Sequence, residues 1–334
     1  MRRLAIVLAL VLVALVAVPL LGAHVLAWDQ HPDRVPAPAR RVEIGAGRAL
    51  NAVDTGAGAP IVLVHGLPGT LHDWGQVPEK LAAMGHRVIA YDRTGYGSST
   101  RDAAAPGAYT YASSASDLLA LLDALGIERA ALAGWSYGGG VVQTVAADHP
   151  DRVTHVALLG AVGPALTRGD PDALALVVAS GAGEEILRWV GAVPPVSRAF
   201  LHENLKAAFS KESAIPGGFA ERTQAMLALP GTLTAFIAEE QRSDPSGLHP
   251  ERIRAPALVL HGADDRLVPV AVGEDLARRI PSAELLRLPG GSHMLPLTDP
   301  DLVAGALHAL VAQHGGAEPE AADQAAEGGS RREP

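Results

Sequence analysis

The sequence predicts an α/β fold in which a mostly parallel sheet is interrupted by a helical insertion. From Arg41 to Gly163 short apolar runs alternate with amphipathic stretches, which is typical of parallel strands joined by helices. After Pro164 the strand signal is weak up to about Pro250, and the intervening segments have a helical pattern. Beyond that point the alternation of strand and helix returns. The insertion is therefore expected to form a helical cap over an α/β core.

The expected elements follow from the length and spacing of the apolar residues. Short apolar runs predict strands at residues 42–44, 61–64, 88–91, 130–133, 153–159, 257–260 and 285–288. Longer periodic stretches predict helices at residues 116–125, 139–147, 174–190, 198–209, 219–229, 233–240, 270–280 and 300–312. Pro-Pro, Pro-Gly and Pro-Gly-Gly steps separate the helices of the insertion.

Both ends of the chain are expected to lie outside this fold. Arg2 and Arg3 precede an uncharged, mostly apolar segment, residues 4–27, which would span roughly 36 Å as a helix and could cross a bilayer. An uncleaved anchor is favoured over a cleaved signal peptide, because the apolar region is long and the A-x-A pattern at 37–39 lies far beyond it. Either reading places the folded domain outside the cytoplasm, membrane-anchored or, after cleavage, secreted.

The predicted organisation has six parts. They are a membrane anchor or signal segment at 1–28, a linker at 29–40, the first part of the core at 41–163, the helical cap at 164–250, the second part of the core at 251–314 and a disordered tail at 315–334. The tail carries no large apolar residue and so cannot bury enough surface to order itself.

Composition excludes several classes of function. The formal net charge of -9 leaves no basic stripe for nucleic acid. The chain has no cysteine, which excludes disulfides, thiolate metal sites and a cysteine nucleophile. No H-E-x-x-H or similar ligand cluster is present, so neither a metal nor another cofactor is expected.

One pentapeptide carries the strongest indication of chemistry. Gly134-Trp135-Ser136-Tyr137-Gly138 lies between an apolar run and a helical stretch, so the serine is expected at the apex of a tight turn from strand to helix. Glycines two residues before and after it allow other backbone to pass closely, and the helix N-terminus favours developing negative charge. In a chain with 36 glycines this pattern alone proves little, and its partners decide its meaning.

A serine nucleophile needs a general base and a carboxylate to orient that base. Asp264 and Asp265 follow one late strand, and His293 follows the last one. Residues that follow strand ends gather at the same edge of an α/β sheet. The order along the chain is serine, aspartate, histidine.

Together these motifs resemble the α/β-hydrolase fold superfamily, over residues 41–313. The resemblance includes His65-Gly66-Leu67-Pro68-Gly69 after an early strand, residues 92–98 (DRTGYGS) after the next, the Ser136 turn, the Gly262-x-x-Asp265 loop and the His293 loop. It implies a mostly parallel eight-stranded sheet with helices on both faces.

The resemblance also implies a role for each residue. Ser136 would be the nucleophile, His293 the general base and acid, and Asp265, rather than Asp264, the orienting carboxylate. The backbone N–H groups of Leu67 and Tyr137 would form the oxyanion hole. Trp135 is a candidate pocket residue whose alternative role is packing, His65 is expected to brace the oxyanion loop, and Asp92 is expected to be structural.

The expected function is that of a serine hydrolase acting on a small-molecule carboxylic ester through an acyl-enzyme. Relatives with the same triad cleave C–C bonds of ring-fission products, cleave N-terminal peptide bonds, transfer acyl groups or act as cofactor-free haloperoxidases, and these remain alternatives. A ligand-binding module without catalysis is the alternative from another class.

Overall fold

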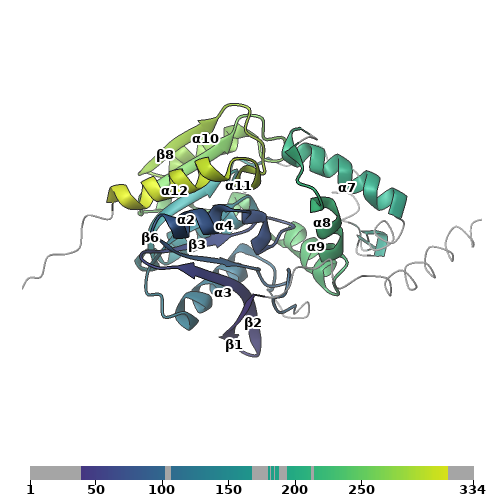
Figure 1. Ribbon diagram of the computed structural model, residues 1–334, viewed down its shortest axis with the longest axis horizontal. Helices are drawn as coiled ribbons and strands as arrows, with labels where there is room; N and C mark the ends of the chain where they lie inside the picture. Colours follow the sequence, from purple (N-terminus) through teal and green to yellow (C-terminus); the bar gives the residue numbers. More distant parts are fainter. Residues whose placement is uncertain are drawn as a thin grey trace, which may run out of the picture.

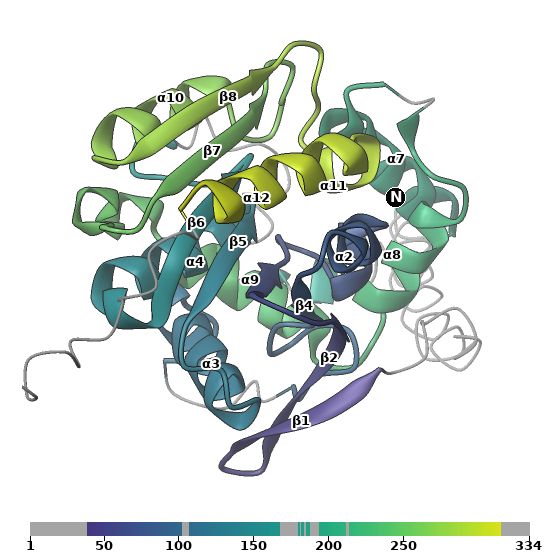
Figure 2. The same ribbon diagram turned by 60° about the vertical axis from the view of Figure 1, so that its left-hand side comes forward.

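The computed structural model describes residues 39–101, 107–167, 180, 182–183, 185–187, 194–211 and 214–314. Eight strands form one sheet in the order β1-β2-β4-β3-β5-β6-β7-β8, and helices lie on both of its faces (Figures 1 and 2). β2 pairs antiparallel with β1 and β4, whereas the pairs from β4 through β8 are all parallel. The predicted α/β fold with a mostly parallel, eight-stranded sheet is confirmed.

The strands are short, and all except β2, which was not predicted, lie close to their predicted positions. They are β1 (Arg40–Gly45), β2 (Arg48–Gly56), β3 (Pro60–Val64), β4 (Arg87–Tyr91), β5 (Ala130–Trp135), β6 (Val153–Leu159), β7 (Ala257–Gly262) and β8 (Ala283–Leu288). The described α-helices are α2 (Val77–Ala83), α3 (Tyr111–Ala124), α4 (Tyr137–Asp148), α7 (Pro194–Phe209), α8 (Phe219–Leu227), α9 (Thr232–Arg242), α10 (Val270–Arg279), α11 (Leu295–Thr298) and α12 (Pro300–His314). Short 3₁₀ turns are η2 (Leu71–Trp74), η3 (Pro150–Arg152), η5 (Pro245–Gly247) and η6 (Pro250–Arg252).

Two apolar layers hold the helices to the sheet. Successive side chains of a strand point to opposite faces, so Val62 and Val64 of β3 join the layer with α3, α4 and α10, while Ile61 and Leu63 join the layer with α2 and α12. Figure 2 shows α2 and α12 together on one side of the sheet. Because both faces are covered, the central strands are almost wholly apolar.

Helices α7, α8 and α9 come from the chain between β6 and β7. In Figure 1 they lie together beside the sheet, on the opposite side from the C-terminal end of α12. α7 begins at Pro194, four residues before the predicted start, because proline fits the first turn of a helix, where its missing N–H would have no partner anyway. The predicted helix at 174–190 lies largely outside the described residues.

The sheet brings the predicted chemistry to one edge. The turn with Ser136 follows β5, the loop with Asp265 follows β7, and the loop with His293 follows β8. These strands are parallel, so their carboxyl ends share an edge, which is where ligand sites of α/β sheets are found.

Other predictions fall on parts of the chain that are not described. These are the anchor or signal segment at 1–28, all but residues 39 and 40 of the linker, and the tail at 315–334. None of the helices in the described ranges has the length and apolar character of a membrane span.

Candidate active site

Ser136 lies at the apex of the turn between β5 and α4. Its φ of 55° and ψ of -121° form a conformation that costs energy for any residue with a side chain. Two glycines give this turn room. A Cβ on Gly134 would lie 2.4 Å from the carbonyl oxygen of Gly138, and a Cβ on Gly138 would lie 2.2 Å from that of Val64. The predicted turn from strand to helix, with the serine at its apex, is confirmed.

Backbone hydrogen bonds hold this turn in place. The Ser136 N–H donates to the carbonyl oxygen of Leu159 at the end of β6, at 3.0 Å, and the Ser136 carbonyl accepts from the Val162 N–H at 3.2 Å. Since α4 begins at Tyr137, its first N–H groups have no partner within the helix. With the helix dipole, they favour negative charge beside the serine.

His293 and Asp265 form a buried hydrogen-bonded pair. Nδ1 of His293 lies 2.7 Å from Oδ2 of Asp265, and both side chains are almost completely inaccessible to solvent. An ionised carboxylate can only accept hydrogen bonds, so it keeps the imidazole proton on Nδ1 and leaves Nε2 as the basic nitrogen. Oδ1 of Asp265 accepts from the N–H groups of Leu267 and Val268 at 2.9 and 2.8 Å. The carboxylate is thereby fixed toward the imidazole.

The neighbouring Asp264 has a different environment. It is exposed, its N–H donates to the carbonyl oxygen of Gly291 at 2.9 Å, and its carbonyl oxygen accepts from Ser210 Oγ at 2.7 Å. The geometry therefore favours Asp265 over Asp264 as the partner of His293.

Trp135 connects the serine turn with the histidine loop. Its indole N–H donates to the carbonyl oxygen of His293 at 2.8 Å, and the two rings lie 5.5 Å apart between centroids. Gly160, which follows β6, lies against the buried pair, because a Cβ there would be 3.1 Å from Asp265 Oδ2 and 3.4 Å from His293 Nδ1. The structure thus gathers Ser136, Asp265 and His293 in one region. Trp135 is buried, with 4% of its surface exposed, and packs against the histidine loop.

The peptide between Gly66 and Leu67 lies beside the serine. A Cβ on Gly66 would be 3.0 Å from Cβ of Ser136. Among the hydrogen bonds between described residues, none uses the N–H of Leu67 or of Tyr137 as donor. Two unused N–H groups next to a serine are what an oxyanion hole requires.

His65 braces this peptide, as the family resemblance implies. Its Nδ1 donates to the carbonyl oxygen of Gly66 and its Nε2 accepts from the Arg93 N–H, both at 2.9 Å. Burial, together with the nearby Arg93 cation, holds the pKa of His65 well below its usual value. The neutral ring can therefore serve as donor and acceptor at once, which both bonds require.

His261 has a comparable supporting role in the acid loop. Its Nε2 lies 2.9 Å from the carbonyl oxygen of Val268, to which it donates. Burial lowers the pKa of His261, which keeps the ring neutral beside Asp265.

Asp92 organises the loop after β4. Its carboxylate accepts from the N–H groups of Leu71 and Ser98 at 2.8 and 2.9 Å and from the side-chain amide of Asn51 at 2.7 Å. Asp92 is therefore a structural loop residue, as predicted.

One buried ion pair was not predicted from the sequence. Arg93 in the loop after β4 bonds to Glu239 of α9, and each side chain is at most 1% exposed. Arg93 belongs to the DRTGYGS motif, but Glu239 is followed by Glu240 in an amphipathic helix, a pattern more typical of a solvated face. No local signal marks Glu239, because its partner lies 146 residues away.

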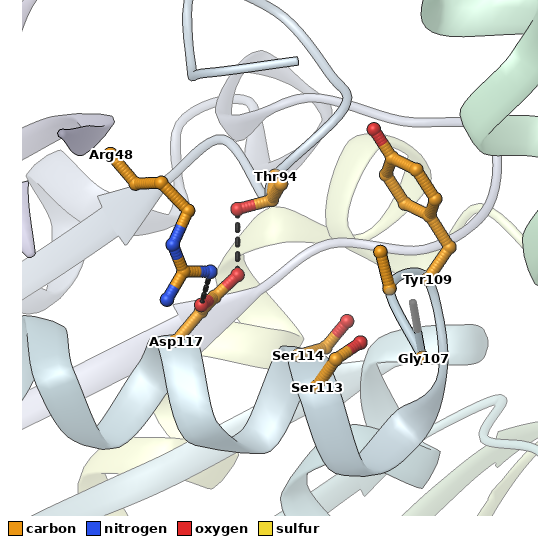
Figure 3. Close-up of a pocket in the computed structure, with 8 residues that line it drawn as sticks. Arg48, Thr94, Gly107, Tyr109, Ser113, Ser114 and Asp117 are labelled. Carbon is orange, nitrogen blue, oxygen red and sulfur yellow. Dashed lines mark hydrogen bonds and ion pairs between the residues drawn. The ribbon is translucent and has the colours of Figure 1, made fainter. Parts of the chain in front are cut away.

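A separate pocket of about 160 Å³ lies over the beginning of α3 (Figure 3). Asp117 there bonds to Arg48 and to the Thr94 hydroxyl, so its charge is already neutralised. None of the predicted catalytic residues lines this pocket. In the described part of the chain, no cluster of three or more His, Asp or Glu side chains could hold a metal ion.

The comparisons with known proteins identify the class that this fold and site define. Residues 59–300 match the family model described as the alpha/beta hydrolase fold. The chain belongs to the alpha/beta hydrolase family.

Individual relatives in this family differ in the reaction they are named for. The chain is 31% identical over 257 residues to a 2-hydroxymuconate semialdehyde hydrolase from Pseudomonas putida, covering 76% of this chain and 87% of the relative. It is also 31% identical over 265 residues to a non-heme chloroperoxidase from Streptomyces lividans, covering 76% and 92%. Among solved structures, a thermophilic esterase from Thermogutta terrifontis matches with a TM-score of 0.62 and 27% identity, over 83% of this chain and all of that one.

The predicted localisation, a membrane-anchored and exported domain, is corrected. A membrane span needs about 20 consecutive apolar helical residues, and no helix in the described ranges meets that requirement. The two relatives match over 257 and 265 residues, 76% of this chain in each case. The segment at 1–28 on which the prediction depended lies outside the described residues.

Proposed function

We propose that this protein is a carboxylic ester hydrolase that forms an acyl-enzyme on Ser136. The observation that carries the proposal is the buried bond between His293 and Asp265, 2.7 Å long, at the edge of the sheet where Ser136 occupies a strained turn. Ser136 would supply the nucleophile and His293 the base, whose Nε2 is not bonded to the carboxylate. Asp265 would orient that base.

The proposed reaction has two halves. His293 Nε2 takes the proton of the Ser136 hydroxyl as its Oγ attacks the ester carbonyl, and the N–H groups of Leu67 and Tyr137 stabilise the resulting oxyanion. His293 then gives the proton to the leaving alcohol. Water, activated by the same imidazole, releases the acid and regenerates the serine. Asp265 keeps the imidazole oriented and stabilises its cationic form.

The acyl group is proposed to be small or lipophilic. Leu67, at the proposed oxyanion hole, packs in an apolar cluster with Leu187 and with Leu233, Phe236 and Ile237 of α9. We extend the proposal to the segment at 164–250, which would act as a helical cap that shelters this apolar surface from water.

The test compares Ser136→Ala with the wild-type protein on p-nitrophenyl esters of two to twelve acyl carbons. Ser136→Ala is expected to lower kcat by at least about 10³-fold without changing the melting temperature, because it removes the nucleophile alone. Ser116→Ala, at an exposed serine of α3, is the matched control and should retain full activity. Retained esterase activity in Ser136→Ala would refute the assignment.

Two further measurements separate the alternatives. Because the relatives are named for other reactions, the same panel of substrates should include a ring-fission semialdehyde, and halide with hydrogen peroxide. Faster turnover of either than of any ester would replace the ester proposal. A fluorophosphonate probe should label Ser136, whereas a folded protein that is neither labelled nor active would indicate a non-catalytic binding module.

A further inference from the structure

Arg93 is a buried cation whose hydrogen bonds converge on the loop beside Ser136. Its Nε donates to the carbonyl oxygen of His65 at 3.2 Å, and its Nη2 donates to that of Gly66 at 2.9 Å. Only 1% of the residue is exposed. The guanidinium therefore bonds two consecutive carbonyl groups of the loop.

The Gly66 carbonyl belongs to the same peptide unit as the Leu67 N–H. In a trans peptide the C=O and N–H groups point in opposite directions, so a donor that fixes the carbonyl also fixes where the N–H points. The Gly66 carbonyl accepts two such bonds, one from Arg93 and one from His65 Nδ1. A charged donor also polarises the peptide, which strengthens its N–H as a donor.

Glu239 of α9 determines where the guanidinium sits. Its carboxylate bonds to Nη1 of Arg93 and, at 3.1 Å, to Nη2, the nitrogen that also reaches Gly66. The Tyr96 hydroxyl donates to the same carboxylate at 2.7 Å. The guanidinium carbon lies 4.4 Å from the ring centroid of Tyr137, the residue that supplies the second proposed oxyanion N–H. One planar group thus bonds the peptide that carries one proposed donor and packs on the side chain of the residue that carries the other.

A contribution to stability alone is a weak reason for this arrangement. Replacing a buried ion pair by apolar residues of similar volume is often neutral or stabilising, because burial of two charges is costly. A planar guanidinium, however, fixes several acceptors in one geometry, which neither an apolar residue nor a lysine can do.

We propose that Arg93 is a positioning residue for the oxyanion hole and that Glu239 locks it in place. Through this pair, helix α9 sets the orientation of the Leu67 N–H. The inference rests on the proposed role of Ser136 and of the Leu67 N–H. It adds that stabilisation of the transition state depends on Glu239, a carboxylate in the chain between β6 and β7.

The test uses Arg93→Lys, which keeps the charge but cannot span Gly66 and Glu239 together. Loss of one oxyanion donor typically lowers kcat by about 10²- to 10³-fold, so a misoriented donor is expected to lower kcat by about 10- to 100-fold with KM nearly unchanged. Affinity for an alkyl trifluoromethyl ketone, which adds to the serine and places an oxyanion in the hole, should fall by the same factor.

Two variants complete the design. Glu239→Asp keeps both charges buried together but withdraws the carboxylate by one methylene. Its kcat and its ketone affinity should both fall by the same factor, and that factor should be smaller than in Arg93→Lys. Arg87→Lys is the matched control: Arg87 also makes a two-bond pair, with Asp54 at 3.0 and 2.8 Å, but away from the loop. Its kcat and ketone affinity should equal those of the wild type.

The outcomes separate this inference from the proposed function. Wild-type kcat and ketone affinity in a folded Arg93→Lys would overturn the inference, as would a rise in KM without a fall in kcat. If both Arg93→Lys and Glu239→Asp fail to fold, the pair serves stability and the inference is also overturned. Retained activity in Ser136→Ala would instead remove the proposed function itself.

Discussion

Two adjacent carboxylates, Asp264 and Asp265, have nearly the same sequence context but different surroundings. Asp265 is buried and accepts three hydrogen bonds, including the one from His293. Asp264 is exposed, and its backbone joins neighbouring loops. Their different burial means that the same substitution can test a role at one position with the other as its control.

Asp265→Asn is expected to lower kcat by about 10³- to 10⁴-fold on the preferred ester. The amide can place a donor against Nδ1, which would favour the wrong imidazole tautomer while the fold is preserved. Steady-state kinetics with a melting curve for each variant make the measurement. Asp264→Asn should retain wild-type kcat, and the reverse ranking of the two variants would assign the orienting role to Asp264.

Single residues also show which parts of the candidate site could be predicted from the sequence alone. Ser136 was predictable because its turn, its glycines and the following helix are contiguous. The roles of His65 and Asp92 were predictable because each lies in a contiguous motif that resembles the family pattern. Glu239 was not, since its meaning depends on Arg93 in a distant loop. Burial of a glutamate is a tertiary property that helical periodicity does not encode.

At the scale of elements, the predicted strands and helices mostly differ from the structure at their ends. β2 was missed entirely, because residues 48–56 alternate poorly and contain polar residues in its second half. The strand forms because its backbone pairs on both sides, with β1 and β4. α3 begins at Tyr111, five residues before the prediction, where Thr110 accepts a capping hydrogen bond from the Ser113 N–H.

Two glycines within helices, Gly138 and Gly305, test how closely the helices pack on the rest of the fold. Gly138→Ala in α4 is expected to destabilise the fold by at least about 3 kcal/mol, because its Cβ would meet the Val64 carbonyl at 2.2 Å, and backbone cannot give way cheaply. Urea unfolding at constant pH measures the difference.

Gly305→Ala in α12 is the control. A Cβ there meets nothing within 4 Å, so the change should stabilise by about 0.5–1 kcal/mol through the lost flexibility of the unfolded chain. Equal effects of the two substitutions would contradict the close approach of α4 to β3.

For the molecule as a whole, α12, the last described helix, packs on α2 and on the residues just before β4, which come from the first part of the core. Nε2 of His86, just before β4, lies 2.9 Å from Nδ1 of His308 in α12, and Lys80 of α2 pairs with Asp301 at 2.6 Å. Burial, and then the neighbouring His308, lower the pKa of His86. Two imidazoles joined in this way need one of the facing nitrogens to be an unprotonated acceptor.

Stability is therefore expected to fall as the pH drops below about 6.5. The folded protein has a lower pKa for His86 than the unfolded chain, so it binds fewer protons there and loses stability as the pH falls through the folded-state pKa. Urea unfolding between pH 5 and 8 should show a smaller loss in His86→Gln than in the wild type. His249→Gln, at an exposed histidine, is the control, and an unchanged pH dependence in His86→Gln would disprove the contribution.

The bond between Arg93 and Glu239 also limits how freely segments can be exchanged among relatives. A chimera that takes its residues between β6 and β7 from another family member would leave the buried Arg93 cation without a partner. The exception is a graft that brings a carboxylate to the position of Glu239. Swaps intended to change substrate preference should therefore carry that glutamate along.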